Sequence, residues 1–217
     1  GNNEDDINGK WRIFQIAFIL MNLESIVNPS IENRKVADLL WFPTGGGKTE
    51  AYLGIIAFTI AFRRLIAPKV KTEDGEQMLS TQAYGVTVIM RYTLRLLTIQ
   101  QFQRAAALMC ACEFERRNNT KTWGDLQFNV GLWVGLNTTP NALLGKDNYN
   151  SAETTLNEWK NPQKRNNPDY RPSSHNPVQL LSCPWCGHEL GPMDYKVKGD
   201  EKNLLPDKCR AYCPGKG

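Results

Sequence analysis

The sequence has no apolar run long enough to cross a membrane, for which about 20 consecutive apolar residues are needed. Its most apolar stretch, 13–21, contains Gln15 and is bounded by Arg12 and Glu24. A secretory signal is also missing, because the first ten residues are polar and acidic rather than basic and then apolar. We therefore expect a soluble, cytoplasmic protein with no membrane partner.

The sequence also lacks internal repeats, long low-complexity runs and a strong excess of one charge. Its 26 basic and 22 acidic residues give a net charge of +4, which permits a nucleic-acid partner without predicting one. At 217 residues and 41% hydrophobic content, the chain can form one ordinary domain with a small appendage. It begins Gly1-Asn2-Asn3 without a methionine and stops at Gly217, so we expect a fragment of a longer protein.

The apolar patterning predicts alternating helices and strands. Helical spacing or composition marks 11–26, 48–66 and 93–117, and short apolar runs predict strands at 37–42, 85–91 and 128–135. Residues 68–84 are polar and are expected to form a surface connection. Strands that alternate with helices predict an α/β fold, in which a parallel sheet carries helices on both faces.

A change of composition after Pro140 predicts a boundary near 140–150, because the residues that follow are mostly polar. We therefore expect three parts: an N-terminal helix within 1–35, an α/β core over 36–141 and a polar insertion over 142–217.

A glycine-rich segment follows the first predicted strand and ends in a lysine and a threonine: Pro43, Thr44, Gly45, Gly46, Gly47, Lys48 and Thr49. Glycines let backbone amides turn toward a phosphate, and the next helix adds its N-terminal dipole. Lys48 can neutralise the β and γ phosphates of ATP, and Thr49 can bind Mg²⁺. The alternative is a glycine-rich turn without a ligand, and Phe42 departs from the usual first small residue of such loops.

This loop resembles motif I of superfamily 2 helicases and translocases, which implies a RecA-like core, with Lys48 and Thr49 as catalytic residues. Arg12 and Gln15 resemble the segment of that superfamily whose glutamine reads adenine, although Gln15 can also be an ordinary polar position on its helix. Downstream, four residues resemble motif Ia, whose side chains contact the phosphate backbone of a bound strand: Arg91, Thr93, Arg95 and Gln100. The alternative for this segment is the solvated face of a helix.

Longer runs within 11–141, such as Ala-Asp-Leu-Leu-Trp-Phe-Pro-Thr-Gly-Gly-Gly-Lys-Thr-Glu-Ala-Tyr, resemble the helicase-like subunit of the DISARM anti-phage defence system. The resemblance implies a bacterial, ATP-dependent, DNA-binding protein. It also implies two partners in the same system, a subunit with a domain of the DUF1998 type and a DNA methyltransferase.

One departure from the superfamily concerns catalysis, which needs an Asp-Glu pair after an apolar strand. The Asp5-Asp6 and Asp200-Glu201 pairs both lack such a strand. The resemblance implies that the parent protein hydrolyses ATP. We expect this fragment alone to bind nucleotide weakly at best and to be inactive in hydrolysis. One alternative is a zinc-containing nucleic-acid or protein-docking module with a non-catalytic loop. Another is a small-molecule kinase, which the motif Ia-like segment disfavours.

The cysteines predict a zinc ribbon in the insertion, held by Cys183, Cys186, Cys209 and Cys213. A two-residue gap lets both thiolates of the first pair reach one tetrahedral Zn²⁺. His188, or a cysteine beyond the chain, can substitute for one ligand, and a redox pair is the alternative. The remaining cysteines, Cys110 and Cys112, are expected to be small core residues, and Trp41 and Trp133 are expected to pack in core strands.

Overall fold

The computed structural model describes residues 10–42, 46–71, 77–79, 85–92, 95–135, 138–140, 142–144, 151–166, 176–198 and 203–206. Three long helices dominate these residues: α1 (Ile13–Val27), α2 (Lys48–Ile66) and α3 (Arg95–Asn118). They confirm the three helices predicted from apolar spacing. Among the described helices, none is both long and apolar enough to span a bilayer.

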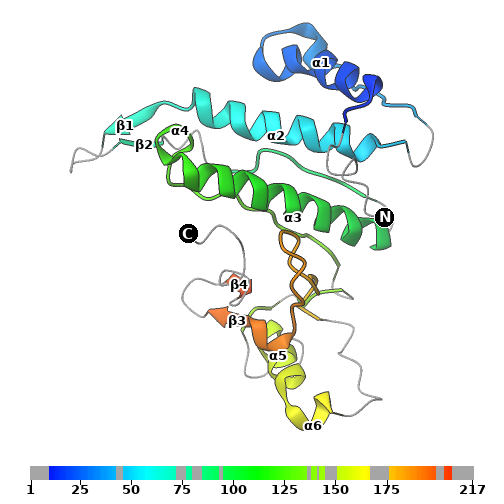
Figure 1. The fold of residues 1–217 in the computed structure, drawn as a ribbon, viewed down its shortest axis with the longest axis vertical. Coiled ribbons are helices and arrows are strands. Elements are labelled where there is room, and N and C mark those ends of the chain that lie inside the picture. The colour runs from blue at the N-terminus through cyan, green and yellow to red at the C-terminus, as the bar shows by residue number, and fades with distance from the viewer. Residues whose placement is uncertain are drawn as a thin grey trace, which may run out of the picture. The chain divides into compact units, whose positions relative to one another are not determined.

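The described residues also form five shorter helical segments (Figure 1): η2 (Glu32–Lys35), α4 (Thr120–Trp123), α5 (Ala152–Lys160), α6 (Pro162–Arg165) and η4 (Pro192–Asp194). The start of α5 has a clear local cause. Ser151 is fully buried at its N-cap, and its hydroxyl accepts a hydrogen bond from the backbone N–H of Thr154 at 3.1 Å. Such a cap satisfies an amide that the first helical turn leaves without a partner.

Helices α1 and α2 pack side by side in the first part of the chain (Figure 1). A small residue allows the close approach, because a Cβ added to Gly54 would lie 2.8 Å from Ile19 Cδ1 and 3.0 Å from the Trp11 ring. Phe18 and Tyr52 add an edge-to-face aromatic contact with ring centroids 5.8 Å apart. This packing places the N-terminal turns of both helices next to the glycine-rich loop.

Only two small sheets occur among the described residues, and both are antiparallel. Strand β1 (Lys69–Lys71) pairs with β2 (Gln77–Leu79), so the predicted surface connection contains a short ladder. Strand β3 (Tyr195–Lys198) pairs with β4 (Asn203–Pro206). The segments predicted as parallel strands, 37–42, 85–91 and 128–135, form no ladder there. The RecA-like parallel sheet and the zinc ribbon thus stay predictions.

The expected packing of two tryptophans is wrong for the described structure. Trp41 is 83% exposed and Trp133 is 98% exposed. Both lie in segments that predict strands, and a strand side chain becomes buried only when neighbouring strands or a helical layer cover it. In the described residues no such layer covers these two rings.

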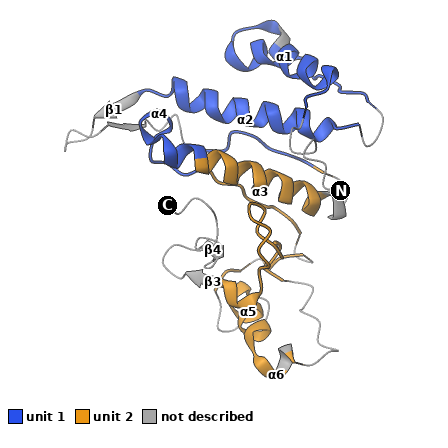
Figure 2. Cartoon of the chain, viewed as in Figure 1, with its two compact units in different colours: residues 1–91, 115–127 blue, residues 92–114, 128–217 orange. Residues whose placement is uncertain are grey.

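The chain divides into two compact units, 1–91 with 115–127 and 92–114 with 128–217 (Figure 2). This division cuts α3, whereas the predicted parts 1–35, 36–141 and 142–217 follow the chain order. Those three parts stay a prediction.

Buried arginines hold the first unit together. Arg64 is 5% exposed and donates to the carbonyl oxygens of Trp123 and Gln127 at 3.3 Å each. Arg116 is 7% exposed and donates to the carbonyl oxygen of Gly124 at 3.0 Å. Both guanidinium groups therefore fasten the turn that follows α4, because a buried cation must find hydrogen-bond acceptors.

The second unit has its own apolar core, formed by Leu156, Val178, Cys183, Leu190 and Tyr195. Tyr195 also donates its hydroxyl hydrogen to the Leu180 carbonyl oxygen at 2.7 Å. The core joins α5 to the hairpin that carries the first predicted zinc ligands.

Candidate functional site

The described end of the glycine-rich loop is built around Gly47, the N-cap of α2. Its backbone is left-handed, with φ of 90°, a region that glycine enters without steric cost. A Cβ at this position would lie 2.7 Å from Gln15 Nε2 and 3.3 Å from Glu50 Oε2. Glycine is therefore required here by conformation and by space.

Lys48 bends back over the loop. Its Nζ donates to the carbonyl oxygen of Phe42, six residues earlier in the chain. The bond links the end of the first predicted strand to the first turn of α2. Among the described residues, the ammonium group therefore bonds to a neutral carbonyl oxygen, which a phosphate oxygen can replace.

Phe42, which departs from the usual small residue, finds its place outside the loop. Its ring stacks on Phe14 of α1 with centroids 3.9 Å apart and an interplanar angle of 11°. Sequence reasoning did not assign this contact. The sequence does contain a signal for this contact, because Phe14 directly precedes Gln15 and Phe42 occupies the first position of the loop pattern.

Two side chains at the start of α1 bond directly to the loop. Arg12 donates from Nη1 to the Gly46 carbonyl oxygen at 2.8 Å, and Gln15 donates from Nε2 to the Gly47 carbonyl oxygen at 2.7 Å. Gln15 Oε1 accepts from the Arg12 backbone N–H at 2.8 Å, and the side chain is 4% exposed. Both ends of the Gln15 amide are therefore engaged within the protein, and its reading of adenine stays a prediction.

The remaining residues predicted to hold ATP-Mg are only partly described. Gly46 is buried, and Lys48 and Thr49 are half-buried in the first turn of α2. Thr44 and Gly45 lie outside the described residues, as does Pro43. The structure thus brings together Arg12, Gln15, Gly46, Gly47 and Lys48, and the magnesium role of Thr49 stays a prediction.

The residues predicted to contact nucleic acid fall in different parts of the chain. Arg91 is exposed at the end of the first unit, and Gln100 is exposed on α3 in the second unit. Arg95 is the first residue of α3, but its side chain lies outside the described set, and Thr93 lies outside it altogether.

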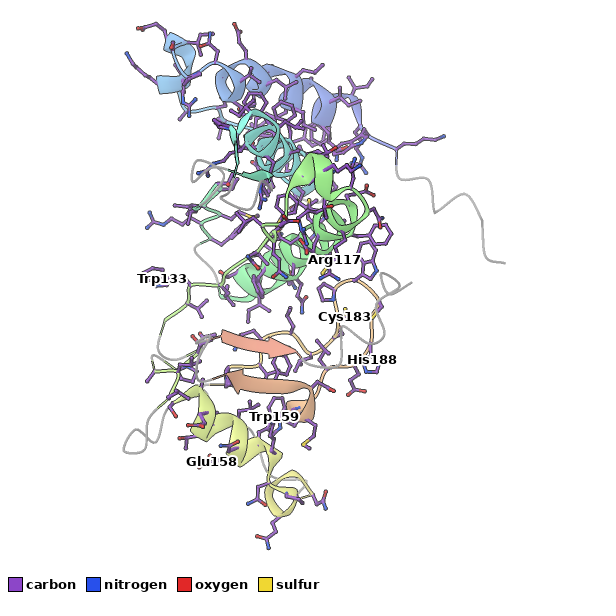
Figure 3. All side chains as sticks on the ribbon, turned by 90° about the vertical axis from the view of Figure 1, so that its left-hand side faces the viewer. Arg117, Trp133, Glu158, Trp159, Cys183 and His188 are labelled. Atoms are coloured by element: carbon purple, nitrogen blue, oxygen red, sulfur yellow. The ribbon has the colours of Figure 1, made fainter. Side chains whose placement is uncertain are left out.

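The first half of the predicted zinc site is a tight hairpin turn, which we call the knuckle (182–187). The Cys183 N–H donates to the His188 carbonyl oxygen at 2.7 Å, and the Gly187 N–H donates to the Cys183 carbonyl oxygen at 2.9 Å. Gly187 closes the turn with φ of 72°. Cys183 is 2% exposed, Cys186 is exposed, and Figure 3 shows Cys183 and His188 on the same loop.

The knuckle offers half of a metal site. Two thiols on one turn suit a tetrahedral Zn²⁺, which needs two further ligands to close a structural site. Within the described ranges, no group of three or more His, Cys, Asp or Glu side chains is placed to hold a metal ion. Cys209 and Cys213 lie outside those ranges, so the four-cysteine site stays a prediction.

The knuckle is fastened to α3. Trp185 stacks on Phe114 with ring centroids 5.7 Å apart and an interplanar angle of 27°. Cys183 belongs to the apolar core of the same unit. The other two cysteines, Cys110 and Cys112 on α3, are both half-buried, so their role as core residues stays a prediction.

Comparison with known proteins gives one match over nearly the whole chain, and the matching protein is a DISARM protein. It is the DISARM protein DrmA of Bacillus paralicheniformis (strain ATCC 9945a / NCIMB 11709 / CD-2), which is 40% identical over 204 residues, or 93% of this chain. The resemblance to a DISARM subunit predicted from the sequence is thereby confirmed.

The chain spans 16% of the length of DrmA, so the comparison concerns a segment of that protein. No family profile matches the chain. No solved structure matches it either.

Proposed function

We propose that the chain is the nucleotide-binding segment of a DISARM defence protein that acts as an ATP-dependent DNA helicase or translocase. The observation that carries the proposal is the bond from Lys48 Nζ to the Phe42 carbonyl oxygen, together with the left-handed backbone of Gly47 at the N-cap of α2. The similarity to DrmA supports the defence role. The RecA-like sheet belongs to the same proposal.

Each residue of the loop then has a defined task. Lys48 exchanges the Phe42 carbonyl for the β and γ phosphates of ATP, and Thr49 holds Mg²⁺ at the first turn of α2. Gly46 and Gly47 offer their backbone amides to the phosphates. Arg12 and Gln15 bind the carbonyl oxygens of these two glycines and hold them away from the phosphates. Such preorganisation matters because phosphoryl transfer depends on positioning and on charge stabilisation.

Nucleic acid and zinc belong to the same proposal. Arg91, Thr93, Arg95 and Gln100 contact the phosphates of DNA, which positions a strand without reading its sequence. Zn²⁺ at Cys183, Cys186, Cys209 and Cys213 stabilises the polar insertion. The partners are a DUF1998-type subunit and a DNA methyltransferase of the same defence system, and the Asp-Glu pair needed for turnover is contributed by the longer protein.

Titration with a fluorescent ATP analogue tests the loop. Lys48→Ala is expected to lower affinity at least about tenfold, because it removes a charge-assisted contact to phosphate. Lys35→Ala is a matched control, since Lys35 is 80% exposed and only pairs with Glu32 at 3.4 Å. Equal affinities for wild type and Lys48→Ala would sink the proposal, as would equal DNA-stimulated turnover in a longer chain that includes the Asp-Glu strand.

Metal analysis of purified protein tests the insertion. We expect about one zinc per chain in wild type and loss of zinc in Cys186→Ser, whose exposed side chain leaves the core intact. Cys112→Ser is the control, because it removes a thiol of α3 that is not among the four predicted zinc ligands. A metal-free wild-type protein would refute the zinc site.

A second candidate function is a zinc-containing docking module whose loop no longer turns over nucleotide. This function is favoured by the hydrogen bonds of Lys48 and Gln15, because both side chains donate to main-chain carbonyl oxygens of the protein. Zinc binding together with equal nucleotide affinity of wild type and Lys48→Ala would select this function.

A further inference from the structure

A groove of about 330 Å³ lies between α3 and the knuckle, within the second unit. Gln103, Arg104 and Ala107 line one wall, and Ser182, Pro184 and Gly187 line the other. The stack of Trp185 on Phe114 holds the two walls together. The groove is therefore formed by two elements that are fastened to each other by side-chain packing.

One wall of the groove carries a positive charge. The lining residues include no aspartate or glutamate, and the nearest acids in the sequence are Glu113 on α3 and Glu189, which pairs with Ser182 in an antiparallel bridge. Arg104 is the charged side chain among the lining residues, and Gln103 and Ser182 add neutral donors. A guanidinium with amide and hydroxyl donors beside it is suited to an anion with several oxygens, such as a phosphate.

The position of the groove along α3 suggests where that phosphate comes from. Gln100, Gln103, Arg104 and Ala107 are spaced i, i+3, i+4 and i+7, so they share one face of the helix. Gln100 is exposed and belongs to the segment proposed to contact the backbone of DNA. A strand that passes Gln100 therefore reaches Arg104 about one helical turn later, roughly 6 Å along the axis.

The size and lining of the groove limit what it can hold. Its volume lies at the low end of the range for ligand sites, about 300–1,000 Å³, which suits a single sugar-phosphate unit. Ala107 and Pro184 add apolar surface for the sugar. We infer that the groove between α3 and the knuckle is a further phosphate-binding site for a single-stranded nucleic acid. The inference rests on the nucleic-acid binding included in the proposed function.

Fluorescence anisotropy of a labelled oligothymidylate with the 217-residue chain, purified with zinc, tests the site. Arg104→Ala is expected to weaken binding about tenfold, because a hydrogen bond to a charged group is lost. The slope of log affinity against log salt should fall by about 0.7, the value for one phosphate contact on a single strand. Arg104→Lys should keep the slope, since it keeps the charge.

Arg117→Ala is the matched control, because it removes the same charge from an exposed position on the same helix. Inorganic phosphate and ATP serve as competitors that separate a strand phosphate from a free one. Strong competition by either at equal phosphate concentration overturns the inference. Thermal melting of each variant excludes unfolding as the cause.

The remaining outcomes are distinct. Binding by wild type with an unchanged affinity and slope in Arg104→Ala overturns this site alone. Failure of wild type to bind the oligonucleotide overturns both this site and the nucleic-acid part of the proposed function, whereas the ATP titration of Lys48→Ala still tests the nucleotide part separately.

Discussion

At the scale of single residues, the nucleotide loop depends on a glycine that touches a buried glutamine. Gly47 adopts φ of 90°, and the Gln15 amide donates to its carbonyl oxygen at 2.7 Å. Any side chain at 47 meets both obstacles, since a left-handed backbone disfavours a Cβ and the amide occupies its space. The contact between α1 and the loop is therefore sensitive to a single methyl group.

Gly47→Ala is expected to lower the free energy of unfolding by about 1–3 kcal/mol, the range for a strained backbone position. Urea unfolding, monitored by circular dichroism, measures this change in the free energy of unfolding. Gly131→Ala is the control, because a Cβ there meets nothing within 4 Å. Equal stability of the two variants would contradict the contact.

A second residue-scale feature is the buried guanidinium of Arg64. Arg64→Met removes the donors of the Trp123 and Gln127 carbonyl oxygens, and unsatisfied buried groups cost about 1–3 kcal/mol each. We expect a loss of about 2–4 kcal/mol in the same unfolding measurement. Lys35→Ala should change stability by less than about 1 kcal/mol, as for an exposed ion pair. A similar small change in Arg64→Met would show that these bonds contribute little.

At the scale of elements, the knuckle and α3 act as one piece. Trp185 stacks on Phe114, and Cys183 lies in the core with Leu190 and Tyr195. The groove proposed to bind phosphate exists only while this contact holds. Zinc bound at the knuckle would stabilise the same turn, because metal ligation constrains the backbone that carries the ligands.

Trp185→Ala is expected to destabilise the chain by about 1–2 kcal/mol, since it loses an aromatic pair together with partly buried surface. Trp133→Ala is a control with the same chemical change, and its 98% exposed ring predicts no measurable effect. Thermal melting followed by circular dichroism compares them. A larger loss of stability in Trp133→Ala than in Trp185→Ala would show that the Trp133 ring is buried in a core.

At the scale of the whole molecule, large apolar side chains face solvent in the three segments that predict strands. Leu39 is 87% exposed, Ile89 is 84% exposed and Trp133 is 98% exposed. Central strands of a parallel sheet are normally covered on both faces. Because the chain spans 16% of DrmA, we propose that further strands and helices of a longer protein cover these segments.

Leu39→Thr and Ile89→Thr are therefore expected to change the stability of this chain by less than about 0.5 kcal/mol. The same changes in a longer protein that completes the sheet should cost about 2–4 kcal/mol, as for other losses from a core. Parallel unfolding measurements on both proteins distinguish the cases. A large loss already in the 217-residue chain would show that these side chains are buried without any further segment.

Local patterns were enough to predict the helices and the loop. Helix α2 begins at Lys48 and ends at Ile66 as predicted, because a glycine run precedes it and apolar residues continue without a breaker apart from Gly54. The exposure of Trp41 and Trp133 was not predictable, since an apolar run shows only that a segment can be buried. What covers it depends on residues far away in the chain.

The sequence alone determined the three long helices, the phosphate-loop pattern and the similarity to a DISARM protein, since these depend on neighbouring residues and on the order of residues along the chain. Only the tertiary structure decided that Arg12 and Gln15 bond to the loop and that Trp185 stacks on α3. These contacts join residues at least 32 positions apart, and their geometry follows from how the helices pack. Local patterns carry no information on that packing.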